Sequence, residues 1–201
     1  TAGKIPPFIA TLGAMKILRS VTQQFMQSSS PKVPTGFQQI ARVKVGGQMF
    51  MPILYWLLIA LALYIVSKKT VFGRHVFAVG SNEKTSRLSG INVNRVKLGV
   101  YALMGAVVAI AAVLQVSRIG AMDPANAGSG YELDSIAAVI VGGTSMSGGK
   151  GSVAGTVFGM LIIAVMNNLL NLLGVPPFLR EAFKGAIIIA AVLLQRKSSD
   201  N

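Results

Sequence analysis

Long apolar runs divide this chain and limit what it can fold into. A bilayer hydrocarbon core of about 30 Å is crossed by roughly 20 mostly apolar residues in an α-helix. Of the 201 residues, 52% are hydrophobic and only 12% are charged, with a mean hydropathy of +0.61. We therefore expect a membrane protein. Its candidate spanning helices are Phe8 to Gln27, Met51 to Val66, Leu98 to Val116, Val153 to Leu173 and Phe178 to Leu194.

A sixth apolar stretch, Leu133 to Val141 at the start of the segment Leu133 to Ser147, is too short to cross a bilayer as one helix. A broken or re-entrant helix is expected here, because irregular backbone is tolerated at membrane depth only where protein buries it. The stretch either crosses the membrane or dips in and out, and the terminal pair Arg196 and Lys197 favours crossing. The expected fold is all-α, a polytopic transmembrane helical bundle of about five spanning helices plus this broken or re-entrant helix. We expect one domain over residues 1–201.

Positive charge is concentrated in residues 68–97, here called the basic loop. The chain has a formal net charge of +13, and in this loop Glu83 is the only acid. Cytoplasmic loops are enriched in Lys and Arg, so the basic loop is expected on the inner side, near anionic lipid headgroups. No nucleic-acid motif accompanies it, which argues against a nucleic-acid partner. Its basic residues are Lys68, Lys69, Arg74, Lys84, Arg87, Arg95 and Lys97.

The stretch GGTSMSGGKGS, residues 142–152 and here called the glycine loop, resembles a phosphate-binding loop only superficially. Thr144 stands where that motif needs its first glycine, and Lys150 is followed by Gly151 rather than Ser or Thr. The flanking segments are apolar, so a bend at membrane depth is the better interpretation. Glycines recur every four residues after it, which predicts one close-packing helix face. They are Gly151, Gly155 and Gly159.

Residues suited to catalysis or metal binding are scarce. The chain has no cysteine and a single histidine, His75, so no metal site or cofactor is expected. The apolar segments hold no convergent cluster of carboxylates, which argues against an enzyme.

Polar residues within the apolar segments are candidates for contact with a neighbouring helix or with a sugar in a translocation pathway. Three asparagines share one helix face by their spacing: Asn167, Asn168 and Asn171. A similar stripe on the first segment consists of Lys16, Arg19 and Gln23. Charges there should face a bundle interior, a watery cavity or the membrane interface.

Two long motifs carry a resemblance to a known family. GRHVFAVGSNEKTSRLSGINVNRVK in the basic loop and ELDSIAAVIVGGTSMSGGKGSVAGTVFG around the glycine loop are similar to permease subunits of bacterial ABC importers for ribose, xylose and galactose. Within this group the pattern is most similar to the galactose/methyl-galactoside permeases. The resemblance extends over nearly all 201 residues, but only to the C-terminal portion of the longer family chain. The start at Thr1, without a leader, also suggests part of a longer protein.

The resemblance implies that the basic loop contains the cytoplasmic segment that docks on an ATPase subunit. The residues that it assigns to this segment are Gly80, Asn82, Leu88, Ser89, Gly90 and Ile91. Thr85 and Ser86 depart from the two small apolar residues common in the family. The residues alone agree with a short helix here, because Asn82 can cap its start and Gly90 can end it. A solvated connector is the simpler alternative.

These features together indicate the translocation subunit of an ATP-driven monosaccharide importer, with galactose or methyl-galactoside as the expected sugar. By the resemblance, its partners are ATP-binding subunits, a second permease copy and a periplasmic sugar-binding protein. It would be a multi-pass protein of the bacterial inner membrane, and ATP hydrolysis would belong to the partner subunit. An ion-coupled secondary transporter or a channel is the alternative, although such transporters usually place carboxylates inside their helices.

Overall fold

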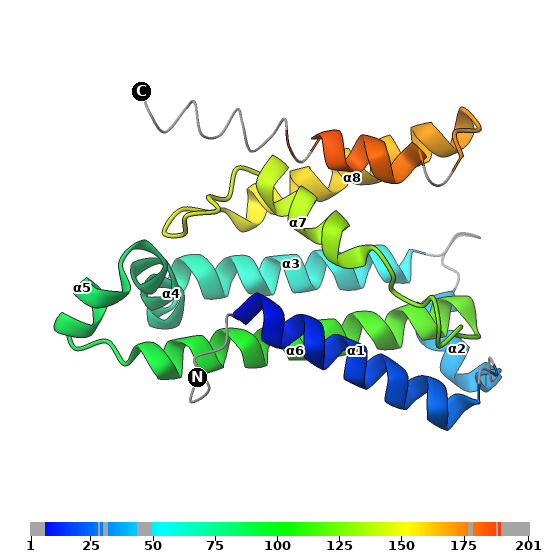
Figure 1. Cartoon of the computed structure of the whole chain (residues 1–201), viewed down its shortest axis with the longest axis horizontal. Helices are drawn as coiled ribbons and strands as arrows, with labels where there is room; N and C mark the ends of the chain where they lie inside the picture. Colours follow the sequence, from blue (N-terminus) through cyan, green and yellow to red (C-terminus); the bar gives the residue numbers. More distant parts are fainter. Residues whose placement is uncertain are drawn as a thin grey trace. The chain divides into compact units, whose positions relative to one another are not determined.

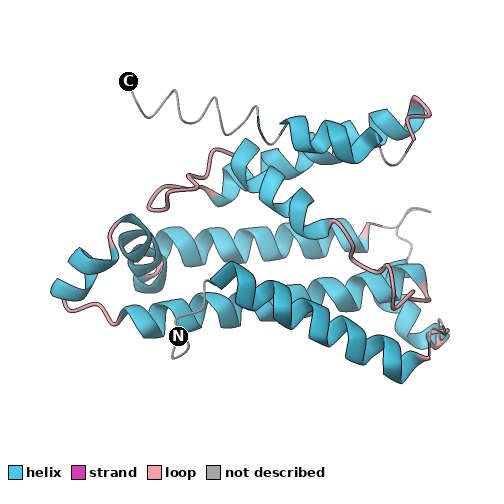
Figure 2. Cartoon of the chain, viewed as in Figure 1, coloured by secondary structure: helices cyan, strands magenta, loops and turns pink. Residues whose placement is uncertain are grey.

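A computed structural model of the chain describes residues 7–27, 29, 32–43, 50–176, 179–187 and 189 (Figure 1). Within these residues the chain is helical and forms no named strand, in agreement with the predicted all-α class (Figure 2). The named helices are α1 (Pro7–Met26), α2 (Thr35–Arg42), α3 (Met51–Lys69), α4 (Val71–Ser81), α5 (Glu83–Leu88), α6 (Val93–Ile119), α7 (Tyr131–Val141) and α8 (Val153–Leu172). Residues 179–187 are helical as well.

Three of the described helices, α3, α6 and α8, are long and apolar enough to cross a membrane. They contain 19, 27 and 20 residues, with mean hydropathies of 1.8, 2.1 and 1.9. Helix α1 lies where the first span was expected, but it is not among these three. The expected span from Phe178 to Leu194 lies partly outside the described residues. A count of about five spans therefore stays a prediction.

Helix α6 is longer than the sequence analysis predicted, because it begins inside the basic loop. The Asn92 side-chain oxygen accepts a hydrogen bond of 3.1 Å from the Arg95 amide, which satisfies one of the free N–H groups at a helix start. Arg95 and Lys97 are therefore helical residues. Much of the remaining basic loop is helical too, in α4 and α5.

The chain divides into two compact units. One comprises Thr1–Pro52 and Ala109–Ser129, and the other comprises Ile53–Val108 and Gly130–Asn201. The boundaries fall within α3 and α6, so each of these helices contributes to both units.

The core of the second unit is small and consists of small or aliphatic side chains. Ala137 and Ala138 of α7 and Ile163 of α8 form a buried cluster, and Ile187 packs against it. In contrast, no side chain of α3 is buried by the part of the chain that the structure describes. Such extensive apolar exposure fits a chain whose natural solvent is lipid, since water-soluble monomers rarely expose large apolar patches.

Candidate functional site

Helix α5 has a complete set of local end contacts within the basic loop. The Asn82 side-chain oxygen accepts a hydrogen bond of 3.0 Å from the Thr85 amide at the start of the helix. At its end Gly90 adopts a φ of 81°, a left-handed conformation that favours glycine. The Gly90 amide donates to Arg87 and the Ile91 amide donates to Ser86, which together form a Schellman motif. The short helix predicted from Asn82 and Gly90 is confirmed.

The end of α5 exposes an apolar side chain. Leu88 is 89% exposed, and Ser89 and Gly90 beside it are exposed as well. In the same helix Ser86 is only 5% exposed, so the position needs a small side chain whether or not it is polar. Thr85, the other departure from the family pattern, contributes its backbone amide to the Asn82 cap. Both departures are therefore compatible with the helix.

An exposed charge cluster joins α5 to the start of α6. The Glu83 carboxylate accepts hydrogen bonds of 2.6 Å from Lys97 and 2.9 Å from Arg87. These two cations, first Lys97 and then Arg87, hold the pKa of Glu83 below its ordinary value. Glu83 is thus charged at neutral pH, and it connects α5 to α6 through Lys97.

Helix α4 connects α3 to α5 through a tight corner. The Thr70 side chain caps α4 by accepting a hydrogen bond of 3.1 Å from the Gly73 amide. Gly73 is buried, and a Cβ atom placed on it would lie 2.5 Å from the Val66 carbonyl oxygen of α3. Only glycine fits at this corner, because real Cβ contacts below 3.0 Å essentially never occur.

Helices α7 and α8 pack backbone to backbone (Figure 1). A Cβ atom on Gly142 would lie 2.5 Å from the Gly155 carbonyl carbon, and one on Gly159 would overlap the Ala138 carbonyl oxygen. Because Gly142 faces Gly155 and Ala138 faces Gly159, the two helices run antiparallel. Close approach through small residues is a common mode of helix association in membranes.

One member of the predicted glycine face lies elsewhere. Gly151 precedes α8, because the Ser152 side chain caps that helix by accepting a hydrogen bond of 3.3 Å from the Gly155 amide. A Cβ atom on Gly151 would meet the Thr144 side chain at 3.0 Å, within the glycine loop itself. The expectation that Gly151 shares a helix face with Gly155 and Gly159 was therefore wrong.

The predicted pathway asparagines lie in the second half of α8. Asn168 and Asn171 are exposed, whereas Asn167 is half-buried. The Asn167 side-chain oxygen is buried and accepts no hydrogen bond within the described part of the chain. Their role as pathway residues stays a prediction.

An ion pair at the start of α7 was not predicted from the sequence. The Lys184 ammonium lies 2.8 Å from the Asp134 carboxylate and 3.0 Å from that of Glu181. The side chains of Lys184 and Asp134 are only 12% and 21% exposed. The available signal was a lysine inside an apolar segment, which needs a partner when it is removed from water.

In the other unit, two arginines bind backbone carbonyls. Arg19 of α1 donates to the carbonyl oxygens of Ala125 and Ala127, at 2.8 and 3.1 Å. Arg42 of α2 donates to those of Arg118 and Ile119, each at 3.0 Å. The last carbonyls of a helix carry partial negative charge, so Arg42 stabilises the end of α6. These carbonyl oxygens take the place of an acidic partner, which the sequence does not provide near Arg42.

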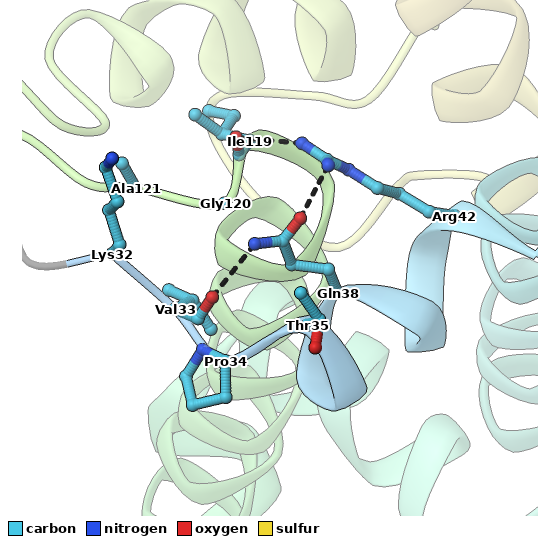
Figure 3. A pocket seen from close by; sticks show the side chains of 9 residues that line it. All are labelled: Lys32, Val33, Pro34, Thr35, Gln38, Arg42, Ile119, Gly120 and Ala121. Atoms are coloured by element: carbon cyan, nitrogen blue, oxygen red, sulfur yellow. Dashed lines mark hydrogen bonds between the residues drawn. The ribbon is translucent and has the colours of Figure 1, made fainter.

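A shallow cavity of about 590 Å³ lies beside this contact (Figure 3). Its lining includes Lys32, Gln38 and Arg42, and Gln38 donates to the Val33 carbonyl oxygen at 2.9 Å. Gln38 also accepts a hydrogen bond from Arg42, so the polar groups of the wall bind mainly one another. Among the described residues no group of His, Cys, Asp or Glu is arranged to hold a metal ion, and His75 is half-buried in α4.

A family model and individual known proteins match nearly the whole chain. A family model described as branched-chain amino acid transport system / permease component matches residues 2–192. The ribose import permease protein RbsC of Bacillus subtilis (strain 168) is 44% identical over 202 residues, covering 99% of this chain and 62% of that protein. RbsC of Escherichia coli (strain K12) is 42% identical over 201 residues, covering 97% and 62%.

A third relative is the xylose transport system permease protein XylH of Escherichia coli (strain K12). It is 41% identical over 176 residues, covering 83% of this chain and 44% of that protein. This chain thus spans less than two thirds of the length of each of these relatives. No solved structure matches it.

Proposed function

Because the chain belongs to the family of branched-chain amino acid transport system permease components, we propose that it is part of the membrane subunit of an ATP-driven monosaccharide importer. Three relatives named as ribose or xylose permeases support a sugar substrate. Three long apolar helices support an integral membrane protein, which we assign to the bacterial inner membrane. The subunit would bind and release sugar while a partner subunit hydrolyses ATP.

The sugar is proposed to be a pentose. The names of these relatives specify ribose and xylose, and the galactose expected from the sequence pattern has no support among them. Uptake assays should therefore begin with ribose and xylose, and galactose should be included as the third sugar.

The observation that carries the proposal is α5, a capped helix with an 89% exposed leucine at its end. A helix of 6 residues is too short to be stable alone, so its local end contacts and a docking partner must hold it. An exposed apolar side chain on a helix, such as Leu88, is suited to insertion into an apolar groove. We assign that groove to the ATP-binding subunit. A second permease copy and a periplasmic sugar-binding protein would complete the assembly.

The same geometry supports an orientation. Its positive charge favours the inner side of the membrane for the basic loop. Gly148 and Gly149 of the glycine loop contact Gly80 and Ser81 of α4, so the glycine loop belongs on the same side. Helix α7 with the glycine loop would then cross toward the inside, and α8 would return outward. This favours the crossing alternative over a re-entrant dip.

The function can be tested with two glycines that share a backbone conformation. Gly90 and Gly128 have φ values of 81° and 70°, and a Cβ atom on either would meet nothing within 4 Å. Replacement by valine strains both turns similarly, but only Gly90 ends α5. In the complete complex, Gly90→Val should insert normally yet lose co-purification of the ATPase and sugar uptake. Gly128→Val should retain both.

The alternative makes a different prediction for the same variant. If Gly90→Val inserts normally, loses the ATPase and still accumulates sugar against a gradient, an ion-coupled secondary transporter becomes the better description. Equal losses in Gly90→Val and Gly128→Val would show that the strain, rather than α5, causes the defect.

A further inference from the structure

The C-terminal end of α4 contacts the glycine loop mainly through backbone atoms, together with the Ser81 Cβ atom. A Cβ atom on Gly80 would lie 3.0 Å from the Gly149 amide nitrogen, and one on Gly149 would lie 2.8 Å from the Ser81 Cα atom. One on Gly148 would overlap the Gly80 carbonyl oxygen. Gly148 and Gly149, which also have positive φ, are therefore required at this contact, and a side chain in place of Gly80 would push the loop away by a few tenths of an ångström.

This contact lies directly beside α5. Ser81 is the last residue of α4, and the next residue, Asn82, caps α5. A displacement of α5 must therefore move the backbone that touches the glycine loop. One residue separates the proposed docking helix from the contact.

The glycine loop is in turn tied to α7 and α8. Inside the loop, the Ser145 amide donates to the Lys150 carbonyl oxygen at 2.9 Å, and the Gly148 amide donates to that of Ser145 at 3.1 Å. Gly142 at one end packs on the Gly155 backbone. Helix α7 is also held at its start by the Asp134–Lys184 ion pair. The glycine loop joins α7 to α8 along the chain (Figure 2), and these contacts tie the loop to both helices.

We propose that Gly80, Gly148 and Gly149 form a mechanical link that transmits displacement of α5 to α7 and α8. Side-chain contacts can absorb small movements by changing rotamer, but backbone contacts have no such freedom. The three glycines are positioning residues that act through the helices they join. This inference rests on the proposed function, because it assumes that α5 receives force from an ATPase.

A matched pair of variants tests the link. Gly148 and Gly143 lie in the same loop with φ values of 85° and 82°, but a Cβ atom on Gly143 would meet nothing within 4 Å. Alanine strains both backbones equally, and only Gly148→Ala forces α4 away from the loop. In the complete complex in proteoliposomes, ATP hydrolysis and uptake of radiolabelled ribose and xylose are measured together.

The link predicts that the ATPase stays bound and active in Gly148→Ala. The amount of sugar moved per ATP should fall about fivefold or more, a factor at the lower end of those typical for energetic coupling between two sites. Gly143→Ala should keep the wild-type ratio. A merely structural role would reduce both activities together. Equal ratios in the two variants, with normal uptake by the wild type, would refute the link alone. Absence of uptake by the wild type would instead refute the proposed function.

A disulfide gives a second test that holds even if Gly148→Ala fails to assemble. In this cysteine-free chain, Ser81→Cys and Gly149→Cys place two thiols at the contact. Reduced, the added side chains should separate the segments and lower the uptake per ATP. Oxidised, the covalent bond should restore the link and raise the ratio toward the wild-type value. A normal ratio in the reduced form, or no gain on oxidation, would overturn the inference.

Discussion

The side-chain hydroxyl of Ser117 donates a hydrogen bond of 2.8 Å to the carbonyl oxygen of Phe37, a residue 80 positions away in the chain. The same hydroxyl accepts a hydrogen bond of 3.0 Å from the Ala41 amide. In an α-helix, the amide of residue 41 would pair with the carbonyl of residue 37. The Ser117 side chain, which is fully buried, therefore bridges one turn of α2 and fixes it to α6.

Ser117→Ala should destabilise the protein by about 1–3 kcal/mol, because it removes a partner from two polar groups of α2. Thermal unfolding in detergent would measure the change. Ser135→Ala is the control, since its exposed hydroxyl donates to the Tyr131 carbonyl oxygen within its own helix. The control should stay within about 0.5 kcal/mol of the wild type. Similar losses in both variants would contradict the bridging role.

Replacement by alanine should lower the stability of the protein at one helical glycine and raise it at another. Gly159→Ala places a Cβ atom on the Ala138 carbonyl oxygen, so α7 and α8 must separate, at a cost of about 1–3 kcal/mol. Gly105→Ala in α6 meets nothing within 4 Å and should stabilise the helix by about 0.5–1 kcal/mol. Unfolding of both variants in the same detergent tests this. Destabilisation by both would contradict the difference in packing.

The Asp134–Lys184 pair should couple more strongly than an exposed pair. A double-mutant cycle with Asp134→Asn and Lys184→Met should give a coupling energy above about 1 kcal/mol, because both side chains are mostly buried. The exposed Glu83–Arg87 pair, taken through the same cycle with glutamine at both positions, should couple less. A larger coupling for the exposed pair would mean that burial does not strengthen the interaction.

Stability should depend on pH through Glu83. Lys97 and Arg87 lower its pKa in the folded protein, so its contribution is complete well above the ordinary value of 4.5 and is lost as the pH falls through the lowered pKa. Glu83→Gln should therefore unfold at a lower temperature than the wild type at neutral pH, with the gap closing in acid. Glu132→Gln is the control and should show no comparable gap. High salt should also narrow the difference in unfolding temperature between Glu83→Gln and the wild type, because it screens exposed charges. A gap that persists in acid would exclude this mechanism.

Membrane orientation can be measured with single cysteines. Thiols introduced at Ser81 and Ser147, both exposed, should resist an impermeant reagent in intact cells, because both loops are expected inside. One at Ser129 should react. Reaction at Ser147 together with Ser129 would restore the re-entrant alternative for α7.

Local features were predictable from the sequence, whereas contacts between distant segments were not. Asn82 and Gly90 act on residues a few positions away, so their spacing alone predicted α5. Long apolar runs likewise predicted α3 and α8. The approach of Gly80 to Gly149 joins segments 69 positions apart, and nothing in either segment specifies its partner. Gly151 was misplaced because a four-residue period continues past a helix end, which the Ser152 cap determines.

Helix α3, whose 19 residues bury no side chain, has a consequence for how this sequence can change over generations. A buried side chain is constrained in volume and shape by the atoms around it. No side chain on α3 is buried within the described chain, so at its exposed positions exchange among leucine, isoleucine, valine and phenylalanine changes the transfer free energy only slightly. Random substitution should therefore accumulate along α3 while its hydropathy is retained. The glycine contacts, in which one added carbon atom meets backbone, should permit almost none.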